Sequence, residues 1–194
     1  GMMEGEKVCT FFVFCYSSNM IPQKSLLLHD IRSVHNVGSI FRTADAFGVQ
    51  TIYISGHTPA PIDRFGRKRA DMAKVALGAE DAVKWEVVSG DSGLGSVLDF
   101  LKKQKKQGVK ILVLEQHDNS VHLSTVRFGK GEPALLIVGN EVGGVPQEII
   151  DLADVIAEIP MLGKKESLNV SVSAGIAMYQ VFGDDRRSDH FDRQ

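Results

Sequence analysis

Continuously apolar runs alternate with segments of helical periodicity along most of this chain. Short apolar runs predict buried strands at residues 26–31, 51–55, 83–88, 110–115, 134–139 and 155–160. The segments between and after them predict helices at residues 36–47, 96–107, 146–154 and in the last part of 162–183. Strands that are apolar throughout and alternate with helices are typical of a parallel sheet with helices on both faces. The pattern therefore predicts one α/β domain.

The last apolar segment, residues 162–183, reads LGKKESLNVSVSAGIAMYQVFG. Apolar residues fall on nearly every side of its helix, which predicts burial over much of the helix surface. Polar Ser167 and Asn169 stand where this helix begins, and unpaired backbone N–H groups there can hold the negative atoms of a ligand. A run this apolar usually belongs to the protein core. The segment could therefore be an ordinary core helix or a helix whose start holds a ligand.

The helix predicted at 36–47 opens on a second polar position. We expect Asn36 to cap its N-terminus and Gly38 to leave the first turn open for close approach. Arg42 lies among apolar residues of the same helix, and a charged side chain there needs a carboxylate, a phosphate or backbone carbonyls as its partner. A structural salt bridge would satisfy that need as well as a ligand would.

Residues 135–146, LLIVGNEVGGVP, lead from an apolar strand into a glycine-rich loop. Ligands of open parallel sheets bind beyond the carboxyl ends of the strands, and Gly143 and Gly144 permit close backbone approach there. The loop lacks the lysine of a phosphate-binding P-loop and does not match the dinucleotide pattern GxGxxG. A ligand-binding loop and a plain turn are both compatible with it.

The 194 residues carry a formal net charge of −2, with 43% hydrophobic and 24% charged residues, which is ordinary for a globular protein. Basic residues still cluster, and a local basic face on a neutral protein can bind phosphates. One cluster lies in a segment, 57–74, that we predict to be a mobile loop, and it consists of Arg64, Arg67, Lys68 and Arg69. The other lies in the helix predicted at 96–107 and consists of Lys102, Lys103, Lys105 and Lys106. Solvated charge runs are the alternative reading of both.

Cys9 and Cys15 are the only cysteines and form no CxxC pair, so we expect neither a disulfide scaffold nor a thiolate zinc site, as in a reducing cytosol. The apolar run 8–16 is far shorter than a membrane span of about 20 residues and is a poor signal peptide. We predict a cytoplasmic protein without a metal. Its parts are an N-terminal extension at 1–24, one domain at 25–183 and a polar tail at 184–194.

Three stretches carry a resemblance to a known family: NVGSIFRTADAFG, IVGNEVGGVP and IPMLGKKESLNVSVSAG. In this order they resemble the three signature motifs of the SpoU (TrmH) family of RNA ribose 2′-O-methyltransferases, within the SPOUT superfamily. The resemblance covers residues 25–183. It implies a homodimer with a deep C-terminal trefoil knot that holds S-adenosylmethionine in a bent conformation.

The resemblance also implies roles for particular residues. Arg42 matches the arginine thought to act on the target ribose hydroxyl, in a site composed with the other subunit. The remaining catalytic positions that it implies are Asn36, Glu141, Ser167 and Asn169. The positions whose backbone it implies along the adenosyl part of the methyl donor are Gly139, Ile159 and Leu168.

The chemistry of the implied reaction suits these residue types. A ribose 2′-hydroxyl is a poor nucleophile, so attack on a sulfonium methyl group needs removal of its proton or stabilisation of the developing charge. Arginine is normally protonated, so charge stabilisation by Arg42 is at least as reasonable as a role as base. The methyl donor supplies the electrophile, and no metal is needed.

Two other functions stay open at the level of sequence. One is an RNA-binding SPOUT module that has lost catalysis, and the other is a nucleotide-binding protein that holds phosphate at Gly143 and Gly144. The choice between tRNA and rRNA as substrate is open too. Family members that act on rRNA commonly carry a separate N-terminal RNA-binding domain, which the short extension here does not resemble. We therefore expect RNA recognition from the dimer surface and the two basic clusters.

Overall fold

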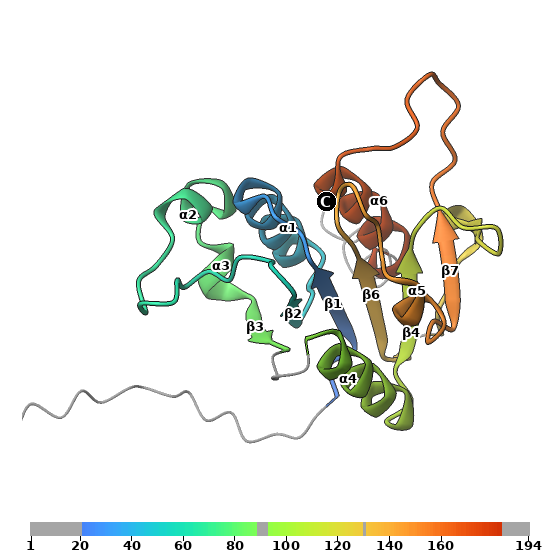
Figure 1. The fold of residues 1–194 in the computed structure, drawn as a ribbon, viewed down its shortest axis with the longest axis horizontal. Coiled ribbons are helices and arrows are strands. Elements are labelled where there is room, and N and C mark those ends of the chain that lie inside the picture. Colours follow the sequence, from blue (N-terminus) through green and yellow to red (C-terminus); the bar gives the residue numbers. More distant parts are fainter. Residues whose placement is uncertain (1–20, 89–92, 130, 184–194) are drawn as a thin grey trace, which may run out of the picture.

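The computed structural model describes residues 21–88, 93–129 and 131–183. Seven strands of these ranges form one sheet in the order β3-β2-β1-β6-β4-β7-β5, with every neighbouring pair parallel (Figure 1). The strands are β1 Lys24–His29, β2 Thr51–Ser55, β3 Lys84–Val87, β4 Lys110–Leu114, β5 Val121–His122, β6 Ala134–Val138 and β7 Val155–Glu158. The predicted parallel α/β architecture is confirmed.

The burial of the strands explains why apolar runs in the sequence predicted their positions. β2 and β6 are buried at every position, and β1 is buried at all but its first residue. A strand covered on both faces cannot alternate polar and apolar residues. β5 was not predicted, because it has only two residues, both exposed, at the edge of the sheet.

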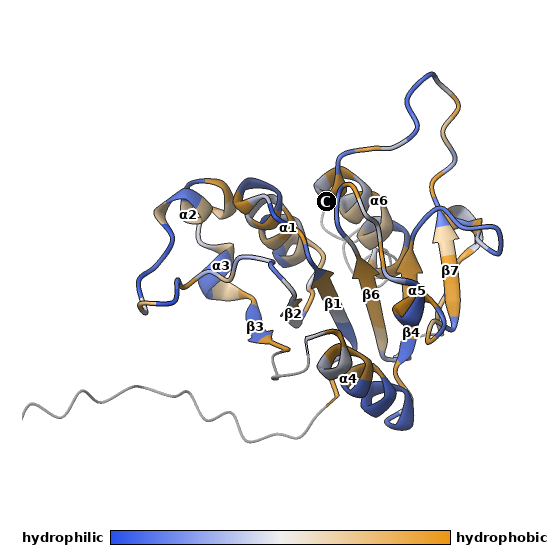
Figure 2. Ribbon diagram, viewed as in Figure 1, coloured by the Kyte–Doolittle hydropathy of each residue, from blue (hydrophilic) through white to orange (hydrophobic). Residues whose placement is uncertain are grey.

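Helices cover both faces of the sheet. They are α1 Val34–Ala46, α2 Ala70–Ala76, α3 Ala79–Ala82, α4 Leu94–Lys106, α5 Gln147–Ile150 and α6 Val170–Phe182, with a 3₁₀ turn, η1, at Leu123–Thr125. One core cluster joins α1, α2 and α6 to one face, and a second joins α4 and α5 to the other. The strands between them are the most hydrophobic part of the ribbon (Figure 2). None of the helices in the described ranges is long and apolar enough to cross a membrane.

The start of α1 corrects one prediction. The helix begins at Val34, and Ser33 is its cap, because the Ser33 Oγ accepts a hydrogen bond from the Asn36 backbone N–H at 3.2 Å. Asn36 therefore lies in the first turn and is not the cap. Serine and asparagine are both good capping residues, so a sequence with one at each of two nearby positions does not distinguish them. The consequence is that the Asn36 side chain is free for other partners.

The segment between β2 and α4 also differs from the prediction. The loop after β2 ends at Arg69 rather than at Lys74, because the first residues of α2 continue from it. Both α2 and α3 are single short helices with weak periodicity, and Leu77 with φ of 53° separates them. The predictions for Cys9 and Cys15, for the N-terminal apolar run and for the polar tail concern residues outside the described ranges.

The last helix, α6, is less buried than its composition predicts. Its inner face carries the buried residues Ala174, Ala177, Met178 and Phe182. The opposite face leaves Val172, Ile176 and Tyr179 exposed at 49%, 41% and 56%. The predicted burial over much of the helix surface holds for the inner face, and the exposed residues mark the side that does not meet the rest of the domain.

Candidate active site

The three polar stretches meet beyond the carboxyl edge of the sheet. The Asn36 Nδ2 of α1 donates to Glu141 Oε1, in the loop after β6, at 2.9 Å. The Asn169 Nδ2, at the start of α6, donates to Asn36 Oδ1 at 3.1 Å. Residues more than a hundred positions apart are thus joined in one chain of hydrogen bonds. The three motifs that carry the family resemblance thus meet in the structure.

Asn169 is also the cap of α6, which fixes the direction of its side chain. Its Oδ1 accepts from the Ser171 backbone N–H at 2.9 Å and from the Ser171 hydroxyl at 2.6 Å. The amide nitrogen on the other side of the same group is then aimed at Asn36. One side chain thereby closes the helix end and ties α6 to α1.

The loop after β6 is held in shape by Asn140. The Asn140 Oδ1 accepts from the backbone N–H groups of Val142 and Gly143 at 2.9 and 2.7 Å. Its Nδ2 donates to the backbone carbonyl of Asp30, after β1, at 2.8 Å. The turn closes at Gly144, whose φ of 66° suits glycine. The adjoining Glu141 carboxylate is consequently presented from a fixed turn.

Gly139 is required by packing within the loop. A Cβ on this residue would lie 2.6 Å from Val145 Cγ2 and 2.7 Å from the carbonyl oxygen of Gly144. No side chain fits at such distances, so the backbone of the loop can approach β6 only at a glycine. The sequence suggested that the glycines of this loop let a ligand approach the backbone closely. At Gly139, the group that approaches closely is the loop itself.

Asp30 joins this network to the next loop along the sheet. Its Oδ1 accepts from the His57 backbone N–H at 3.0 Å and lies 2.6 Å from His57 Nδ1. Partial burial raises the pKa of Asp30, but the hydrogen bonds from His57 and the charges of His57 and Arg32 outweigh burial and lower that pKa below its ordinary value. The ionised carboxylate therefore favours the folded state at neutral pH, and this contribution is lost as the pH falls through the lowered pKa.

Two residues that the sequence reading missed follow β4. The Glu115 Oε2 accepts from the backbone N–H of Val145 at 2.9 Å, on the loop after β6. The Gln116 Nε2 donates to the backbone carbonyl of Glu166, in the segment before α6, at 2.7 Å. Adjacent side chains thus hold both loops of the site. Their position directly after a buried strand was the available signal, since polar residues at that edge of a parallel sheet often serve a site.

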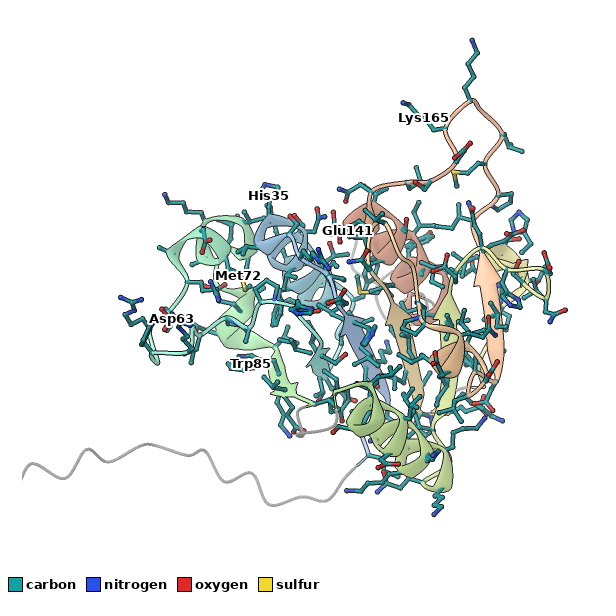
Figure 3. The ribbon with its side chains drawn as sticks, viewed as in Figure 1. His35, Asp63, Met72, Trp85, Glu141 and Lys165 are labelled. Carbon is teal, nitrogen blue, oxygen red and sulfur yellow. The ribbon has the colours of Figure 1, made fainter. Side chains whose placement is uncertain are left out.

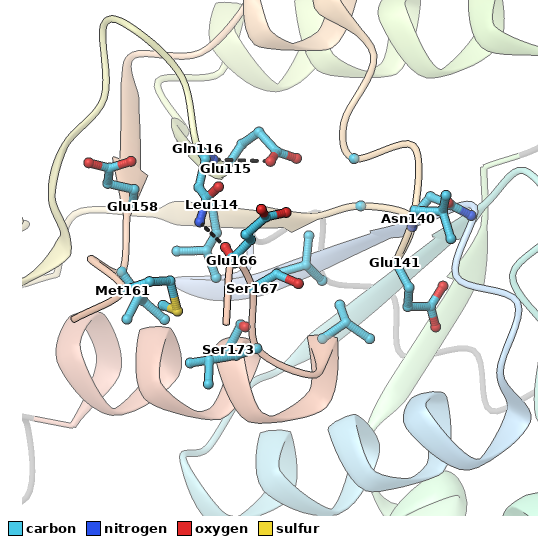
Figure 4. A pocket seen from close by; sticks show the side chains of 17 residues that line it. Leu114, Glu115, Gln116, Asn140, Glu141, Glu158, Met161, Glu166, Ser167 and Ser173 are labelled. Carbon is cyan, nitrogen blue, oxygen red and sulfur yellow. Dashed lines mark hydrogen bonds between the residues drawn. The ribbon is translucent and has the colours of Figure 1, made fainter. Parts of the chain in front are cut away.

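These loops surround a cavity of about 320 Å³ (Figure 4). Its lining includes five of the residues predicted for the site, namely Gly139, Glu141, Ile159, Ser167 and Leu168. The rest of the lining comes from the ends of β4, β6 and β7, from the loops that follow these strands and from the first turn of α6. The cavity therefore lies where parallel sheets usually bind ligands.

The cavity is acidic. Four glutamates line it, Glu115, Glu141, Glu158 and Glu166, and its lining contains no Lys, Arg or His. Their carboxylates favour a ligand that carries positive charge and disfavour a polyphosphate. Within the described ranges no three His, Cys, Asp or Glu side chains are grouped as in a metal site.

Asn36, Asn169 and Arg42 do not line this cavity. Asn36 and Asn169 stand beside it through their bonds to Glu141 and to each other. Arg42 is exposed on α1 and borders a separate depression with Asp45 and Leu77. Its guanidinium makes no hydrogen bond or ion pair with the residues that the structure describes. The structure thus brings together all the predicted catalytic residues except Arg42.

The two basic clusters lie apart from the cavity. The loop with Arg64 to Arg69 lies at the outer end of the α2–α3 side, as the separation of Asp63 from Glu141 shows (Figure 3). The lysines of α4 precede β4 and so stand at the amino edge of the sheet, opposite the cavity (Figure 1).

Comparison with known proteins agrees with these observations. The profile of the SpoU rRNA Methylase family matches residues 23–179. The tRNA (guanosine(18)-2'-O)-methyltransferase of Escherichia coli (strain K12) is 32% identical over 160 residues, which is 82% of this chain and 63% of that protein. The 23S rRNA (guanosine-2'-O-)-methyltransferase RlmB of Nitrosomonas europaea is 34% identical over 161 residues, which is 83% of this chain and 56% of that protein.

A solved structure has the same architecture. The AdoMet-bound rRNA methyltransferase from Sinorhizobium meliloti superposes with a TM-score of 0.70 at 27% identity, over 83% of this chain and 57% of that one. The chain thus spans less than two thirds of the length of these three relatives. The profile match, the two sequence relatives and the meeting of the three motifs lead to one conclusion: the chain belongs to the SpoU family.

Proposed function

We propose that this protein transfers a methyl group from S-adenosylmethionine to a ribose 2′-hydroxyl of tRNA or rRNA. The observation that carries the proposal is the chain of hydrogen bonds from Asn169 through Asn36 to Glu141 at the rim of an acidic cavity. Relatives from E. coli and N. europaea are named as RNA 2'-O-methyltransferases, one for tRNA and one for rRNA. The proposed substrate is therefore either tRNA or rRNA.

The cavity fits the methyl donor. S-Adenosylmethionine carries a positive sulfonium and a positive ammonium group, and four carboxylates line the cavity. Ile159, Met161 and Leu168 supply apolar lining for an adenine ring, and Gly139 lines the cavity with them. When bound, the donor supplies an electrophilic methyl group. We assign Gly139, Ile159 and Leu168 to holding it.

The side chains at the rim would orient the ribose. The hydrogen bond between Asn169 and Asn36 fixes the direction of both amide groups, and the hydrogen bond from Asn36 to Glu141 keeps Asn36 in place. The Ser167 hydroxyl faces the cavity from the segment before α6. Arg42 would stabilise the negative charge that develops on the 2′-oxygen as its proton leaves. Fixing the hydroxyl in line with the methyl group would contribute much of the remaining acceleration.

A homodimer would supply the missing arginine. Val172, Ile176 and Tyr179 form an exposed apolar face on α6. We call these three residues the α6 stripe. A second copy packed on the α6 stripe would bury it and could bring its own Arg42 to the rim of this cavity. The exposure of Arg42 and its place outside the cavity support this arrangement.

We also propose the trefoil knot of the family for the C-terminal part of the chain. The support is that the last segment contacts the connection between β4 and β6 at two places, near its start and in its middle. Gln116 bonds to Glu166 just before α6, and the Gln180 Nε2 of α6 lies 3.3 Å from the carbonyl oxygen of Val126. A segment that passes through this connection would make both contacts.

We also propose boundaries for the domain. We assign residues 25–183 to the methyltransferase domain, in line with the family match over 23–179. Residues 1–24 are assigned to an extension and 184–194 to a tail. A protein that modifies tRNA or rRNA would act in the cytoplasm. RNA contact would come from the basic loop with Arg64, Arg67, Lys68 and Arg69.

An inactive RNA-binding module is the alternative, and the intact rim argues against it. A protein without catalysis has no need to keep Asn36, Glu141 and Asn169 joined beside an acidic cavity. The nucleotide-binding alternative is disfavoured by the same carboxylates, since they repel phosphates.

Isothermal titration calorimetry with S-adenosylmethionine and with ATP distinguishes these functions. We expect micromolar or tighter binding of S-adenosylmethionine and no measurable binding of ATP. Glu115→Gln should weaken donor binding, because this carboxylate both lines the cavity and holds Val145. Glu132→Gln, away from the cavity, is the control. Tight binding of ATP and none of the methyl donor would contradict the proposal.

A further inference from the structure

The loop between β2 and α2 is a structured turn that carries an aromatic residue at its tip. Asp63 Oδ1 accepts from the backbone N–H groups of Phe65 and Arg67 at 2.8 and 3.0 Å. Ile62 and Lys68 form an antiparallel bridge that closes the base of the turn. The Phe65 residue is 65% exposed at the tip. The loop thus presents a phenyl ring to solvent from a defined backbone.

Three of the four basic residues in this loop are engaged within the protein. The Arg67 guanidinium pairs with Asp63 at 2.8 Å. The Lys68 ammonium pairs with Asp81 at 2.7 Å. The Arg69 Nε donates to the backbone carbonyl of Ala60 at 3.0 Å. These contacts shape the loop and offset part of its charge, so the four residues are not equivalent as RNA contacts.

Arg64 differs from the other three. It makes no ion pair with a carboxylate of the described residues, and its Cζ lies 4.8 Å from the centre of the Phe65 ring. The Arg67 Cζ lies 5.0 Å from the same ring. A cation at this distance is attracted by the face of an aromatic ring. The ring therefore holds a guanidinium with free hydrogen-bond donors at the tip of the loop.

An exposed phenylalanine beside arginine suits an unpaired nucleotide. Bases stack on aromatic rings and on guanidinium planes, and arginine adds a contact to the phosphate. A paired base inside an A-form helix does not offer its face in this way. Figure 2 shows the loop mainly hydrophilic, with a hydrophobic interruption at its outer turn.

We infer that Arg64 and Phe65 bind an unpaired nucleotide of the RNA substrate, with its base stacked on the Arg64–Phe65 pair and its phosphate on Arg64. Arg67 and Lys68 act by holding the loop in shape. The inference rests on the proposed function, since it assumes that the partner is RNA. It adds that the RNA has a single-stranded nucleotide away from the target ribose, because the loop lies apart from the cavity.

Fluorescence anisotropy with labelled RNA tests the inference. The probes are a single-stranded RNA of about 12 nucleotides and the same sequence as a duplex. We expect Phe65→Ala and Arg64→Ala each to weaken single-strand binding about tenfold and to leave duplex binding within about twofold. Lys74→Ala removes one positive charge from an exposed position of the neighbouring helix α2, outside the loop, and is the matched control, with single-strand binding near that of the unchanged protein. Equal losses in Lys74→Ala and Arg64→Ala would overturn the inference.

A Phe65→Trp variant reports stacking directly. The chain has one native tryptophan, so the unchanged protein gives the background signal. We expect the added tryptophan to keep RNA affinity and to be quenched when the single strand binds, because a stacked base quenches indole fluorescence. Tight binding without quenching would overturn the stacking. If Phe65→Ala binds RNA normally while methyl transfer proceeds, the inference fails and the proposed function stands. If the unchanged protein binds no methyl donor, the proposed function itself fails.

Discussion

Replacing Arg42 by alanine is expected to reduce methyl transfer to RNA by about two to four orders of magnitude. The guanidinium is assigned to the charge that develops on the ribose oxygen, and its removal leaves that charge without a partner. The affinity for S-adenosylmethionine should stay within about threefold, because Arg42 does not line the cavity. Single-turnover transfer kinetics and calorimetry measure the two effects separately.

Asp45→Ala is the matched control for this substitution. Asp45 is exposed on the same helix and borders the same depression as Arg42, but no role in transfer is assigned to it. Its variant should retain nearly full activity. Substantial transfer by Arg42→Ala, or an equal loss in both variants, would contradict the role given to Arg42.

Subunit mixing shows which protomer supplies the arginine. Subunits with Arg42→Ala are inactive in the proposal, and so are subunits with Asn169→Ala. If Arg42 acts on the partner's cavity, a mixed dimer contains one site with both residues intact. Mixing equal amounts of the two variants should then restore about a quarter of the activity of the unchanged protein, because half of the dimers are mixed and each has one intact site. No recovery in dimers shown to have exchanged would place Arg42 in its own subunit's site.

A charge in the α6 stripe is expected to abolish both the dimer and the activity. Ile176 is 41% exposed in the single chain, so Ile176→Asp should fold normally as a monomer. Burial of an unpaired carboxylate in an apolar interface costs several kcal/mol, which corresponds to a rise of more than about a hundredfold in the dimer dissociation constant. Sedimentation equilibrium and transfer kinetics should show the two losses together.

The control for this variant is Val121→Asp. Val121 is 44% exposed and lies on the edge strand β5, outside the α6 stripe. This variant should remain dimeric. A monomeric unchanged protein with full activity would contradict the proposed dimer, and so would an Ile176→Asp protein that stays dimeric.

The strands and the meeting of the motifs were predictable because each depends on local pattern. Strands buried on both faces are apolar throughout, and parallel strands bring their carboxyl ends to one edge. That sufficed to place the loop at Glu141 and the start of α6 at the same edge of the sheet. The order of the strands was not predictable from the pattern, since it depends on pairings between distant segments.

Other features of the site depend on which of several suitable partners a side chain finds. Ser33 and Asn36 could each cap α1, and only the fold shows that Ser33 does so and leaves Asn36 for Glu141. The position of Glu115 and Gln116 after a buried strand indicated their edge of the sheet, but it did not indicate their partners, because those are backbone groups that every residue has.

The α6 stripe shows a different limit. An apolar residue that faces the core and one that faces a second subunit have the same composition. The helix was therefore predicted to be buried, whereas Val172 and Ile176 are exposed in the single chain. Likewise, an arginine that acts across a subunit boundary looks unpartnered in one chain.

Analysis of the methylated product tests the central claim most directly. The protein would be incubated with labelled S-adenosylmethionine and, separately, unmodified tRNA and unmodified rRNA, and the RNA would then be digested to nucleosides. The proposal predicts label in a 2′-O-methylated nucleoside from one of the two pools, and the loss of that label with Arg42→Ala. Label on a base, or no label in either pool, would contradict it.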